Sequence, residues 1–481
     1  TSTGVENARY EGRQCAKVIG CVNHDANAIA SHAANHPDAM HFTEDIRTLE
    51  LSPLIAHIAK MRKLYPDAFV VLWASLECTN FSKAKGGQPR DADSRTLAEH
   101  LFRYIEAINP DYIQIENVEE FMSWGDLDEN GKPISKDAGR LYQQWVANVC
   151  GYGYRFVHRI LNSADYGAYT SRRRFFGIFA KGSLPIVFPE PTHSKEGAAG
   201  LFGRLHRWKP VREVLDFSDE GESIFGRKKP LVDATLERIY AGLIKFVAGG
   251  KEAFMVKWNS MSRAGKYNAP GIDEPCPTVT TQSRLGVAQV SFLSIDEPAP
   301  TLTTKDRLAF VDMQYGNGTP CDIETPAPTV TTNPKHQLVT CKPWIMNTSF
   351  KNTGSSIDEP AQTVTANRKW HYRMDKMPPY LIQTEQGEMA IVIEPDDSPA
   401  MVKIKQFMAL YGIIDIKMRM LRIPELKRIM GFPSDYVLVG TQADQKKFIG
   451  NAVEVNIARV LCEALCARLI EEDIKPIRAA A

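Results

Sequence analysis

Apolar runs alternate with amphipathic segments along residues 1–180. Apolar side chains recur at helical spacing over residues 97–108, and this pattern ends at Asn109-Pro110. Five short apolar runs predict strands, at 18–22, 69–74, 112–115, 155–161 and 175–179. Because predicted strands and helices alternate, we expect an α/β fold built on a doubly wound, mostly parallel sheet.

Polar side chains follow three of these predicted strands. Asn23-His24-Asp25 comes after the first strand, Cys78 after the second and Glu116 after the third. In doubly wound sheets, ligands bind beyond the carboxyl ends of the strands. The pattern therefore predicts a binding site at this edge of the sheet.

Residues 195–400 differ in composition from residues 1–180. They contain many Pro, Gly and Thr residues and short segments that favour β-strands. Proline suits a turn and β-branched residues suit a strand, so we expect a set of four related hairpins in a β-rich second domain. One phrase recurs four times and leads each time into a Thr-Val-Thr-like segment: Ile272-Asp273-Glu274-Pro275, Ile295-Asp296-Glu297-Pro298, Ile323-Glu324-Thr325-Pro326 and Ile357-Asp358-Glu359-Pro360.

The helical period returns near the end of the chain, at 401–411, 424–430 and 453–470. The last stretch is amphipathic and needs an apolar surface to cover, for which the first domain is the candidate. We therefore predict a catalytic domain at 1–190, an inserted domain at 195–400, and a segment at 401–481 that returns to the catalytic domain.

Composition narrows the class of protein. The chain has 481 residues and a formal net charge of +1, so any surface for nucleic acid must be a local patch. Nine cysteines without a Cys-x-x-Cys pair favour a reducing compartment over a disulfide framework. The sequence has no apolar run long enough for a membrane span and no targeting pattern, so we expect a cytoplasmic protein.

Cys78 lies in a polar loop that continues to Lys83 and Lys85. An unpaired cysteine is most often a small buried apolar residue, and a lone glutamate at a strand end most often caps a loop. Nearby cations favour the thiolate form of Cys78, and Glu116 on another strand would face the same pocket. A thiol nucleophile beside a carboxylic acid suits chemistry on a pyrimidine ring.

Five segments in a fixed order carry a resemblance to a known family: Glu77-Cys78-Thr79-Asn80-Phe81-Ser82, Glu116-Asn117-Val118, Tyr166-Gly167 through Arg172-Arg173-Arg174, Arg422 to Pro433 with Gly431-Phe432-Pro433, and Phe448-Ile449-Gly450-Asn451-Ala452-Val453. Flanking a variable β-rich insertion, they resemble the cytosine-5 DNA methyltransferase family. The resemblance implies a Rossmann-like catalytic domain and a DNA (cytosine-5-)-methyltransferase.

The family mechanism assigns a role to four residues. The Cys78 thiolate would add to carbon 6 of cytosine, and Glu116 would share a proton with ring nitrogen 3. Arg174 would bond the base carbonyl, and Arg172 would tie down the mobile loop. The methyl group would come from S-adenosylmethionine.

The resemblance also implies the cofactor pocket. Asp45 and Ile46 match the family's adenine-contacting pair, Leu97 matches another contact, and Asn451 and Val453 complete the pocket. After the first predicted strand, either Asp25 takes the ribose hydroxyls or it caps the following helix, and we expect Asn23 and His24 to line the pocket. No metal site is expected.

Double-stranded DNA is the expected partner, and the target base must rotate out of the stack. Residues 82–94, with Ser82, Lys83 and Lys85, would close over it. Cations or amides follow each repeated phrase, and we expect a target-recognition region in which Arg284, Arg307, Lys335 and Arg368 contact DNA. Taken singly, these segments also fit solvated hairpin ends.

Three departures from the family pattern bear on activity. The chain begins where the family's Gly-rich loop should end, so we expect an N-terminally incomplete chain that lacks the first strand. Glu77 replaces a proline and Thr79 replaces a glutamine. A carboxylate beside Cys78 would tend to raise the pKa of the thiol.

Other functions stay open at this point. The same loops would serve a methyltransferase acting on transfer RNA, or a relative that binds DNA without turnover, whereas the missing GxGxxG disfavours a nicotinamide enzyme. A cognate restriction endonuclease is a further expected partner. We expect a monomer of bacterial or phage origin that associates with DNA in the cytoplasm and does not contact membranes.

Overall fold

The computed structural model describes residues 1–75, 98–126, 139–200, 203–258, 267–282, 284–292, 309–313, 321–322, 336–340, 344–347, 355–356, 370–373, 380–384, 387–391, 393–394, 396–411 and 413–476. The chain forms two compact units. Unit 1 comprises Thr1–Val290 and Ile416–Ala481, and unit 2 comprises Ser291–Asp415. The boundaries between these units differ from the predicted domain boundaries at 195 and 400. The predicted boundaries stay a prediction.

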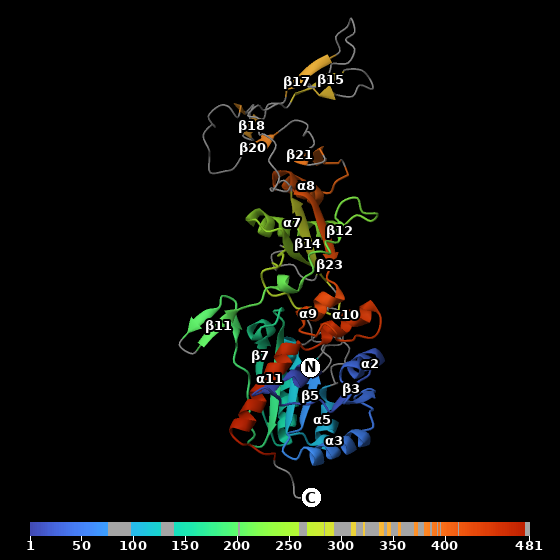
Figure 1. Ribbon diagram of the computed structural model, residues 1–481, viewed down its shortest axis with the longest axis vertical. Coiled ribbons are helices and arrows are strands. Elements are labelled where there is room, and N and C mark those ends of the chain that lie inside the picture. Colours follow the sequence, from blue (N-terminus) through green and yellow to red (C-terminus); the bar gives the residue numbers. More distant parts are fainter. Residues whose placement is uncertain are drawn as a thin grey trace. The chain divides into compact units, whose positions relative to one another are not determined.

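A four-stranded sheet carries the centre of unit 1 (Figure 1). Its order is β5-β6-β8-β7, with bounds β5 (Val71–Ser75), β6 (Tyr112–Asn117), β8 (Arg173–Lys181) and β7 (Tyr154–Asn162). β5 and β6 are parallel, whereas β8 runs antiparallel to both β6 and β7. These four strands lie where the sequence predicts them, and the α/β class is confirmed with a mixed sheet.

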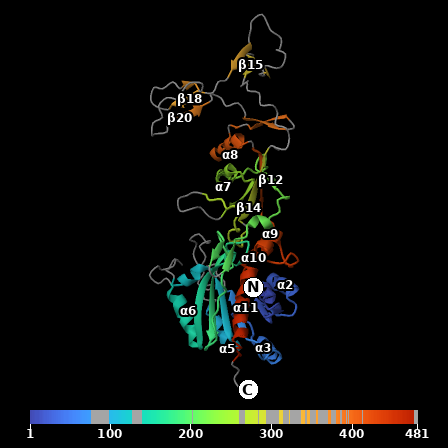
Figure 2. The same ribbon diagram turned by 60° about the vertical axis from the view of Figure 1, so that its left-hand side comes forward.

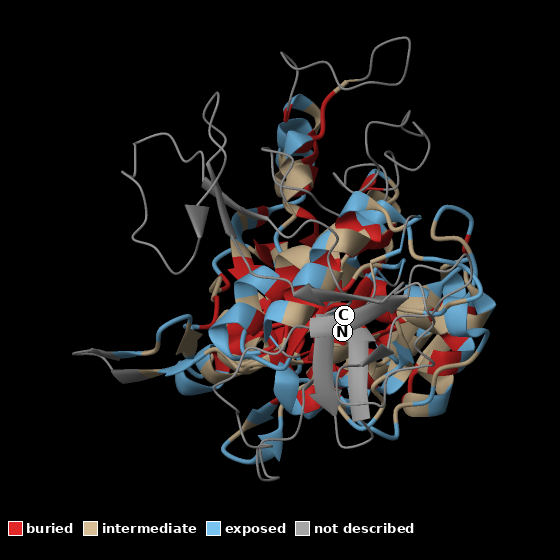
Figure 3. Cartoon of the chain, turned by 90° about the horizontal axis from the view of Figure 1, so that it is seen from above, coloured by how far each residue is buried: buried red, intermediate tan, exposed pale blue. Residues whose placement is uncertain are grey.

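Helices cover both faces of this sheet, as a doubly wound fold requires. Ile113 and Phe175 pack with α5 (Leu101–Ile108) and α6 (Arg140–Gly151). The alternate residues Tyr112 and Phe176 pack with α11 (Val455–Glu471) on the other face. Figure 2 shows α6 and α11 on opposite sides of the strands, and Figure 3 shows the buried residues gathered between the layers. Successive side chains of a strand point to opposite faces of the sheet, so each face contributes to its own apolar core.

A second, two-stranded parallel sheet completes this part of unit 1. β3 (Gly20–Asn23) pairs with β4 (Met40–Thr43), and the helices are α2 (Ala26–Asn35) and α3 (Ser52–Leu64). α3 begins at Ser52-Pro53, because proline suits the first turn of a helix. Among the described residues, β3 pairs only with β4 and β5 pairs only with β6. The apolar pattern of the sequence does not predict β4.

Another mixed group of elements follows in the chain. The sheet order is β12-β23-β14-β13, and α7 (Asp233–Phe246) packs on β13. Its strands are β12 (Glu222–Ser223), β13 (Ala253–Lys257), β14 (Leu285–Phe292) and β23 (Ile413–Met420). α9 (Ile423–Ile429) and α10 (Gln442–Asn451) then lead to α11, and side chains of α9, α10, β13 and β14 share one buried cluster.

The shorter elements of unit 1 are α1 (Ser2–Asn7), β1 (Arg9–Tyr10), β2 (Arg13–Gln14), η3 (Glu119–Ser123), η5 (Ser163–Tyr166), β9 (His193–Ser194), β10 (Ala198–Gly200), β11 (Gly203–Arg207), η6 (Val211–Val214) and η7 (Val247–Gly249). None of the described helices is long and apolar enough to cross a membrane.

Unit 2 contains three small antiparallel sheets and α8 (Pro399–Tyr411). Their strands are β15 (Ala309–Met313), β16 (Cys321–Asp322), β17 (His336–Thr340), β18 (Trp344–Asn347), β19 (Ser355–Ser356), β20 (Trp370–Arg373), β21 (Tyr380–Thr384) and β22 (Gly387–Ile391). The repeated phrases begin at 272, 295, 323 and 357, and strands begin at 285, 309, 336 and 370. A strand therefore starts 13 or 14 residues after each repeated isoleucine.

Candidate active site

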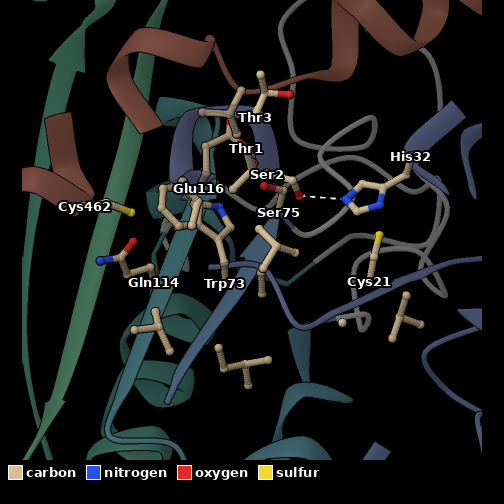
Figure 4. Close-up of a pocket in the computed structure, with 18 of the residues that line it drawn as sticks. Thr1, Ser2, Thr3, Cys21, His32, Trp73, Ser75, Gln114, Glu116 and Cys462 are labelled. Carbon is tan, nitrogen blue, oxygen red and sulfur yellow. Dashed lines mark hydrogen bonds between the residues drawn. The ribbon is translucent and has the colours of Figure 1, made fainter. Parts of the chain in front are cut away.

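A large cavity runs along β3 and β5 and reaches the carboxyl ends of β3, β5 and β6. Its volume is about 2400 Å³, which exceeds the volume of an ordinary small-molecule pocket. Figure 4 shows Trp73, Ser75, Gln114 and Glu116 beside it, with Cys21 and His32 across the opening. The cavity walls include Glu116, Arg172 and Arg174 as well as Asn23, His24, Asp45, Ile46, Asn451 and Val453. The described members of the predicted catalytic and cofactor sets thus border one space.

Glu116 is the buried acid of this cavity. It is the fifth residue of β6, and its residue exposure is 5%. Its Oε1 lies 3.4 Å from Nε of Arg174 and 4.0 Å from Nη2 of Arg172. Two cations beside one carboxyl group offset the cost of burying its charge. The next side chain, Asn117, accepts a 2.8 Å bond from the Val118 amide and shapes the turn.

Arg172 joins three distant parts of the chain. Its side chain is 3% exposed, and Nη1 donates to the carbonyls of Val279 and Gly450, each at 3.2 Å. The loop at 82–94, which the resemblance ties to Arg172, lies outside the described residues. The described partners of Arg172 are two carbonyls and Glu116, so this side chain links parts of the pocket wall, and its contact with the loop stays a prediction.

Arg174 is more accessible than its neighbour, with 17% of its side chain exposed. It lies at the start of β8, where Leu161 is its partner across the sheet. Its Nη1 donates to the carbonyl of Arg173 at 2.7 Å, which fixes the plane of the guanidinium. Since Nε faces Glu116, the group combines a fixed orientation with access from the cavity.

Several predicted site residues lie outside the described residues: Cys78, Ser82, Lys83, Lys85, Leu97, Arg307, Lys335 and Arg368. The structure describes β5, the strand that precedes the predicted nucleophile. Ser75, the last residue of β5, is the register partner of Glu116. Cys78 comes three residues after Ser75, and Ser75 lies directly beside Glu116 in the sheet.

Asn23 is the last residue of β3, His24 follows it, and both border the cavity. Asp25 is the N-cap of α2, and its Oδ1 accepts bonds from the amides of Asn27 and Ala28 at 3.1 and 3.2 Å. Its other oxygen lies 3.2 Å from Nζ of Lys447. Of the two roles expected for Asp25, the capping role is the one its described contacts support.

Asp45 and Ile46 follow β4 at the same edge. Hydrogen bonds from Arg47 lower the pKa of Asp45 to about 2, so its carboxylate is ionised at neutral pH. The Ile46 carbonyl accepts bonds from Arg103 and Tyr104, each at 3.0 Å, which fixes this turn. The Asp45 carboxylate and the Ile46 side chain therefore offer a polar and an apolar contact to a ligand in the cavity.

Asn451 and Val453 enter the cavity wall from the C-terminal segment. Asn451 is the last residue of α10 and is exposed, whereas Val453 is buried. Glu454 follows and caps α11 by accepting bonds from the amides of Asn456 and Ile457 at 3.0 and 2.8 Å. Burial raises the pKa of Glu454 to about 7.

Sequence reasoning missed two polar side chains of the wall. Nε1 of Trp73 and Oε1 of Gln114 are buried, border the cavity and have no hydrogen-bond partner in the described part of the chain. They lie on the neighbouring strands β5 and β6, as register partners (Figure 4). An alternation of polar with apolar residues in 112–117 is the only signal that could have found Gln114.

Arg284 is exposed and borders the cavity together with Gln282, to which its guanidinium donates. Both follow the first repeated phrase. Within the described residues, no group of three His, Cys, Asp or Glu side chains could hold a metal ion. The charged side chains that border the cavity carry carboxylate, guanidinium and ammonium groups.

Comparison with known proteins identifies the family. The model of the C-5 cytosine-specific DNA methylase family matches residues 2–199 and 320–467. Type II methyltransferase M.AgeI of Thalassovita gelatinovora is 27% identical over 180 residues, which are 37% of this chain and 38% of that protein. Type II methyltransferase M.AquIA of Picosynechococcus sp. is 26% identical over 205 residues, 40% of this chain and 76% of that protein.

One solved structure is described as a putative DNA modification methyltransferase encoded within a prophage of E. coli. It is 14% identical, with a TM-score of 0.41, and the match covers 98% of this chain and 96% of that one. The matched part of this chain spans less than half of M.AgeI. The family model, by contrast, matches well over half of the present chain in two parts, and the second part contains the third and fourth repeated phrases. The chain belongs to the C-5 cytosine-specific DNA methylase family.

Proposed function

We propose that this protein transfers a methyl group from S-adenosylmethionine to carbon 5 of cytosine in duplex DNA, through a covalent adduct between Cys78 and a flipped base. One observation carries the proposal. A buried carboxyl group, Glu116, faces a cavity with two guanidinium groups beside it, at the end of a strand whose neighbour leads to Cys78.

The base would be held by Glu116 and Arg174. Carbon 5 of cytosine is a weak nucleophile, so a thiolate must first add to carbon 6. As the sulfur–carbon bond forms, the electrons of the 5,6 double bond move into the ring, and Glu116 exchanges a proton with nitrogen 3. Arg174 donates to the base carbonyl and keeps Glu116 oriented. Carbon 5, now a nucleophile, would bond the methyl group, and the electron pair of the broken sulfur–methyl bond would stay on the cofactor's sulfur. A base would then remove the carbon 5 proton, its electrons would restore the 5,6 double bond, and the Cys78 thiolate would leave.

Cys78 is assigned as the nucleophile by the family resemblance and by its place three residues after β5. Burial raises the pKa of Cys21 to about 11 and that of Cys462 to about 12, although both border the cavity. Burial also raises the pKa of Cys150, Cys276 and Cys466. These five thiols are poor nucleophiles at neutral pH, because only the thiolate attacks.

The cavity residues fit S-adenosylmethionine. When bound, this cofactor supplies an electrophilic methyl group on a positively charged sulfur. The ionised Asp45 carboxylate could accept a hydrogen bond from the amino group of an adenine, and the apolar side chains of Ile46 and Val453 suit the adenine ring. Asn23, His24 and Asn451 would supply polar contacts, and Leu97 is expected to add an apolar one.

Duplex DNA is the proposed substrate. The target atoms of cytosine lie inside the base stack, so the nucleotide must rotate into the cavity. The volume of about 2400 Å³ leaves room for a nucleotide together with a cofactor. Ser82, Lys83, Lys85 and Arg284 would contact the phosphate backbone, with Arg307, Lys335 and Arg368 in the recognition region.

Transfer of labelled methyl groups to duplex DNA tests the proposal. The wild-type chain should transfer label, Cys78→Ala should abolish transfer, and Cys150→Ala should retain it. Cys150 is a matched control, since it is a partly buried thiol away from the cavity. Equal transfer by Cys78→Ala and the wild type would contradict the mechanism.

Competing substrates are resolved by the same assay. Transfer RNA offered beside duplex DNA would take the label if the chain acts on RNA, and DNA binding without transfer would indicate a non-catalytic relative. The name Type II methyltransferase of the relatives supports a cognate restriction endonuclease as partner. A monomer acting on DNA in a bacterial or phage-infected cytoplasm is part of this proposal.

A further inference from the structure

Three polar side chains form a chain of hydrogen bonds that starts at the cavity. Oγ of Ser2, in α1, lies 2.8 Å from Nε2 of His32, in α2. Nδ1 of His32 lies 2.7 Å from Nε2 of His41, in β4. Ser2 and His32 both border the cavity, and Figure 4 shows them facing each other across its opening. We call these three residues the serine–histidine chain.

The two histidines of this chain are neutral at neutral pH. Burial, assisted by the neighbouring rings of His36 and His41, lowers the pKa of His32 to about 3. Burial also lowers the pKa of His41. A neutral imidazole has one N–H and one bare nitrogen, so each ring can donate one hydrogen bond and accept one. A single fixed bond therefore sets the direction of the whole chain.

That fixed bond lies at the end of the chain that is remote from the cavity. His41 is hydrogen-bonded to the backbone of Ala39, and this bond raises the pKa of His41, as donation to a carbonyl does. The proton of His41 is therefore on the nitrogen that faces Ala39, and Nε2 accepts from Nδ1–H of His32. Nε2 of His32 is then bare and accepts from the hydroxyl group of Ser2.

This direction leaves the Ser2 oxygen as an acceptor. A hydroxyl group has one proton and two lone pairs. Because the proton points to His32, Ser2 can offer only lone pairs to a molecule in the cavity. An acceptor selects a ligand group that carries N–H or O–H, and a cationic donor makes the stronger bond. S-adenosylmethionine has one cationic donor, the ammonium group of its amino acid part.

A second histidine holds the same helix without bordering the cavity. Nδ1 of His36 lies 2.6 Å from Oε2 of Glu6, and its Nε2 lies 3.3 Å from Oγ1 of Thr3, so His36 also joins α2 to α1. His36 is 4% exposed and does not line the cavity. Since these bonds already attach α1 to α2, attachment alone does not explain the bond between His32 and Ser2.

We propose that the serine–histidine chain belongs to the cofactor site: it directs the Ser2 proton away from the cavity, so that the Ser2 oxygen accepts a hydrogen bond from the ammonium group of S-adenosylmethionine. Ser2 contacts the cofactor, whereas His32 and His41 are positioning residues that act through Ser2. The inference rests on the proposed function and deepens it, by naming residues to which the family resemblance gives no role.

Binding of two cofactor fragments, measured by calorimetry on the full chain, tests the role of Ser2. S-adenosylhomocysteine has the ammonium group, whereas methylthioadenosine lacks it and keeps the adenosine part. Ser2→Ala should weaken binding of the first ligand by about tenfold, as loss of a hydrogen bond to a charged group does, and leave the second unchanged. Ser2→Thr, which keeps the hydroxyl group, should retain binding of both. An equal loss for both ligands, or no loss for either, would overturn the inference.

Variants of His32 test the positioning role. His32→Leu should weaken binding of S-adenosylhomocysteine relative to methylthioadenosine, because nothing then directs the Ser2 proton. His32→Gln should retain the wild-type ratio of the two affinities, since its amide oxygen can accept from Ser2. His36→Leu is the matched control, which disturbs the attachment of α1 but should leave the ratio unchanged. The same change of ratio in His32→Leu and His36→Leu would overturn the positioning role.

Nitrogen NMR spectra of the chain labelled at histidine read the tautomers directly. We expect neutral rings with the proton on Nδ1 for both His32 and His41, assigned by the loss of each signal in His32→Gln and His41→Gln. A proton on Nε2 of His32 would reverse the chain and overturn the inference. None of these measurements requires methyl transfer. A chain that binds S-adenosylhomocysteine through Ser2 but methylates no DNA would therefore contradict the proposed function alone, while failure of the wild type to bind either ligand would overturn both.

Discussion

Nε of Arg174 lies 3.4 Å from Oε1 of Glu116, on the neighbouring antiparallel strands β8 and β6. Glu116 is almost wholly buried, whereas Arg174 keeps access to the cavity. The pair therefore presents one acid and one cation side by side to whatever enters, and either can reach a ring nitrogen or carbonyl of a planar base.

Glu116→Gln should lower the rate of methyl transfer by about 10²–10⁴-fold, since an amide cannot exchange the proton that nitrogen 3 needs. DNA binding should change little. Rates of label transfer under single turnover measure the effect. Glu119→Gln is the matched control, because Glu119 also pairs with an arginine but is 40% exposed. An unchanged rate for Glu116→Gln would remove this residue from the chemistry.

Arg172→Met should destabilise unit 1 by about 2–4 kcal/mol, because it leaves two carbonyls without their donor and removes one of the two cations beside the buried Glu116. Arg173→Met, at a neighbouring side chain that is 63% exposed, should cost under about 1 kcal/mol. Urea unfolding followed by circular dichroism compares the two. Similar costs would mean that the Arg172 contacts contribute little.

Arg419 and Glu425 form a buried bidentate pair, with both nitrogen–oxygen distances at 2.8 Å. Glu425 also accepts bonds from the amides of Asp216 and Arg422. Glu425→Gln should cost about 3–5 kcal/mol, since the buried Arg419 guanidinium loses its closest carboxylate and keeps the more distant Asp219, at 3.5 Å. The same change at the exposed Glu472, which pairs with Arg468, should be near neutral in a thermal melt.

Stability should fall as the pH rises from about 4.5 to about 7, through Glu454. Burial raises the pKa of Glu454 from 4.5 to about 7, so the folded chain binds more protons than the unfolded chain across this window. The free energy of unfolding must then decrease with pH, and below 4.5 the effect disappears. Glu454→Gln should flatten this slope in melts between pH 4 and 8, whereas the same steep slope in both proteins would exclude Glu454.

Arg284→Glu should weaken binding to duplex DNA and reduce its salt dependence, since one phosphate contact corresponds to about one unit of slope. Arg284 is exposed and borders the cavity. Fluorescence anisotropy across a salt series measures both quantities. Lys60→Glu on α3 is the control, being exposed and away from the cavity. Identical salt slopes for the two variants would argue against a DNA contact at Arg284.

The sequence predicts the central strands well because each is a short apolar run followed by a polar turn. Glu116 could be placed for this reason, and its pairing with Ser75 agrees with the expected edge of the sheet. β4 was not predicted, since Met40–Thr43 is only four residues long and contains a histidine. Short strands that are stabilised mainly by a parallel neighbour leave little periodicity to detect.

Tertiary contacts account for the rest. Arg172 is bonded to carbonyls 107 and 278 residues away, and no local pattern encodes such partners. The capping role of Asp25 could be named as one of two options, but only its bonds to Asn27 and Ala28 select it. The first repeat could be recognised as a repeat, whereas its attachment to the core required coordinates.

β3 and β5 both border the cavity, and no described hydrogen-bond ladder joins them. The wall that carries Asn23 and His24 is therefore attached to the rest of unit 1 by side-chain packing and scattered polar contacts. β6, by contrast, is paired on both sides. Local opening takes less free energy where a ladder is one-sided. Deuterium should reach the amides of Cys21 and Val22 well before those of Ile113 and Ile115, so mild denaturant would loosen the cavity wall at β3 while the sheet behind Glu116 stays closed.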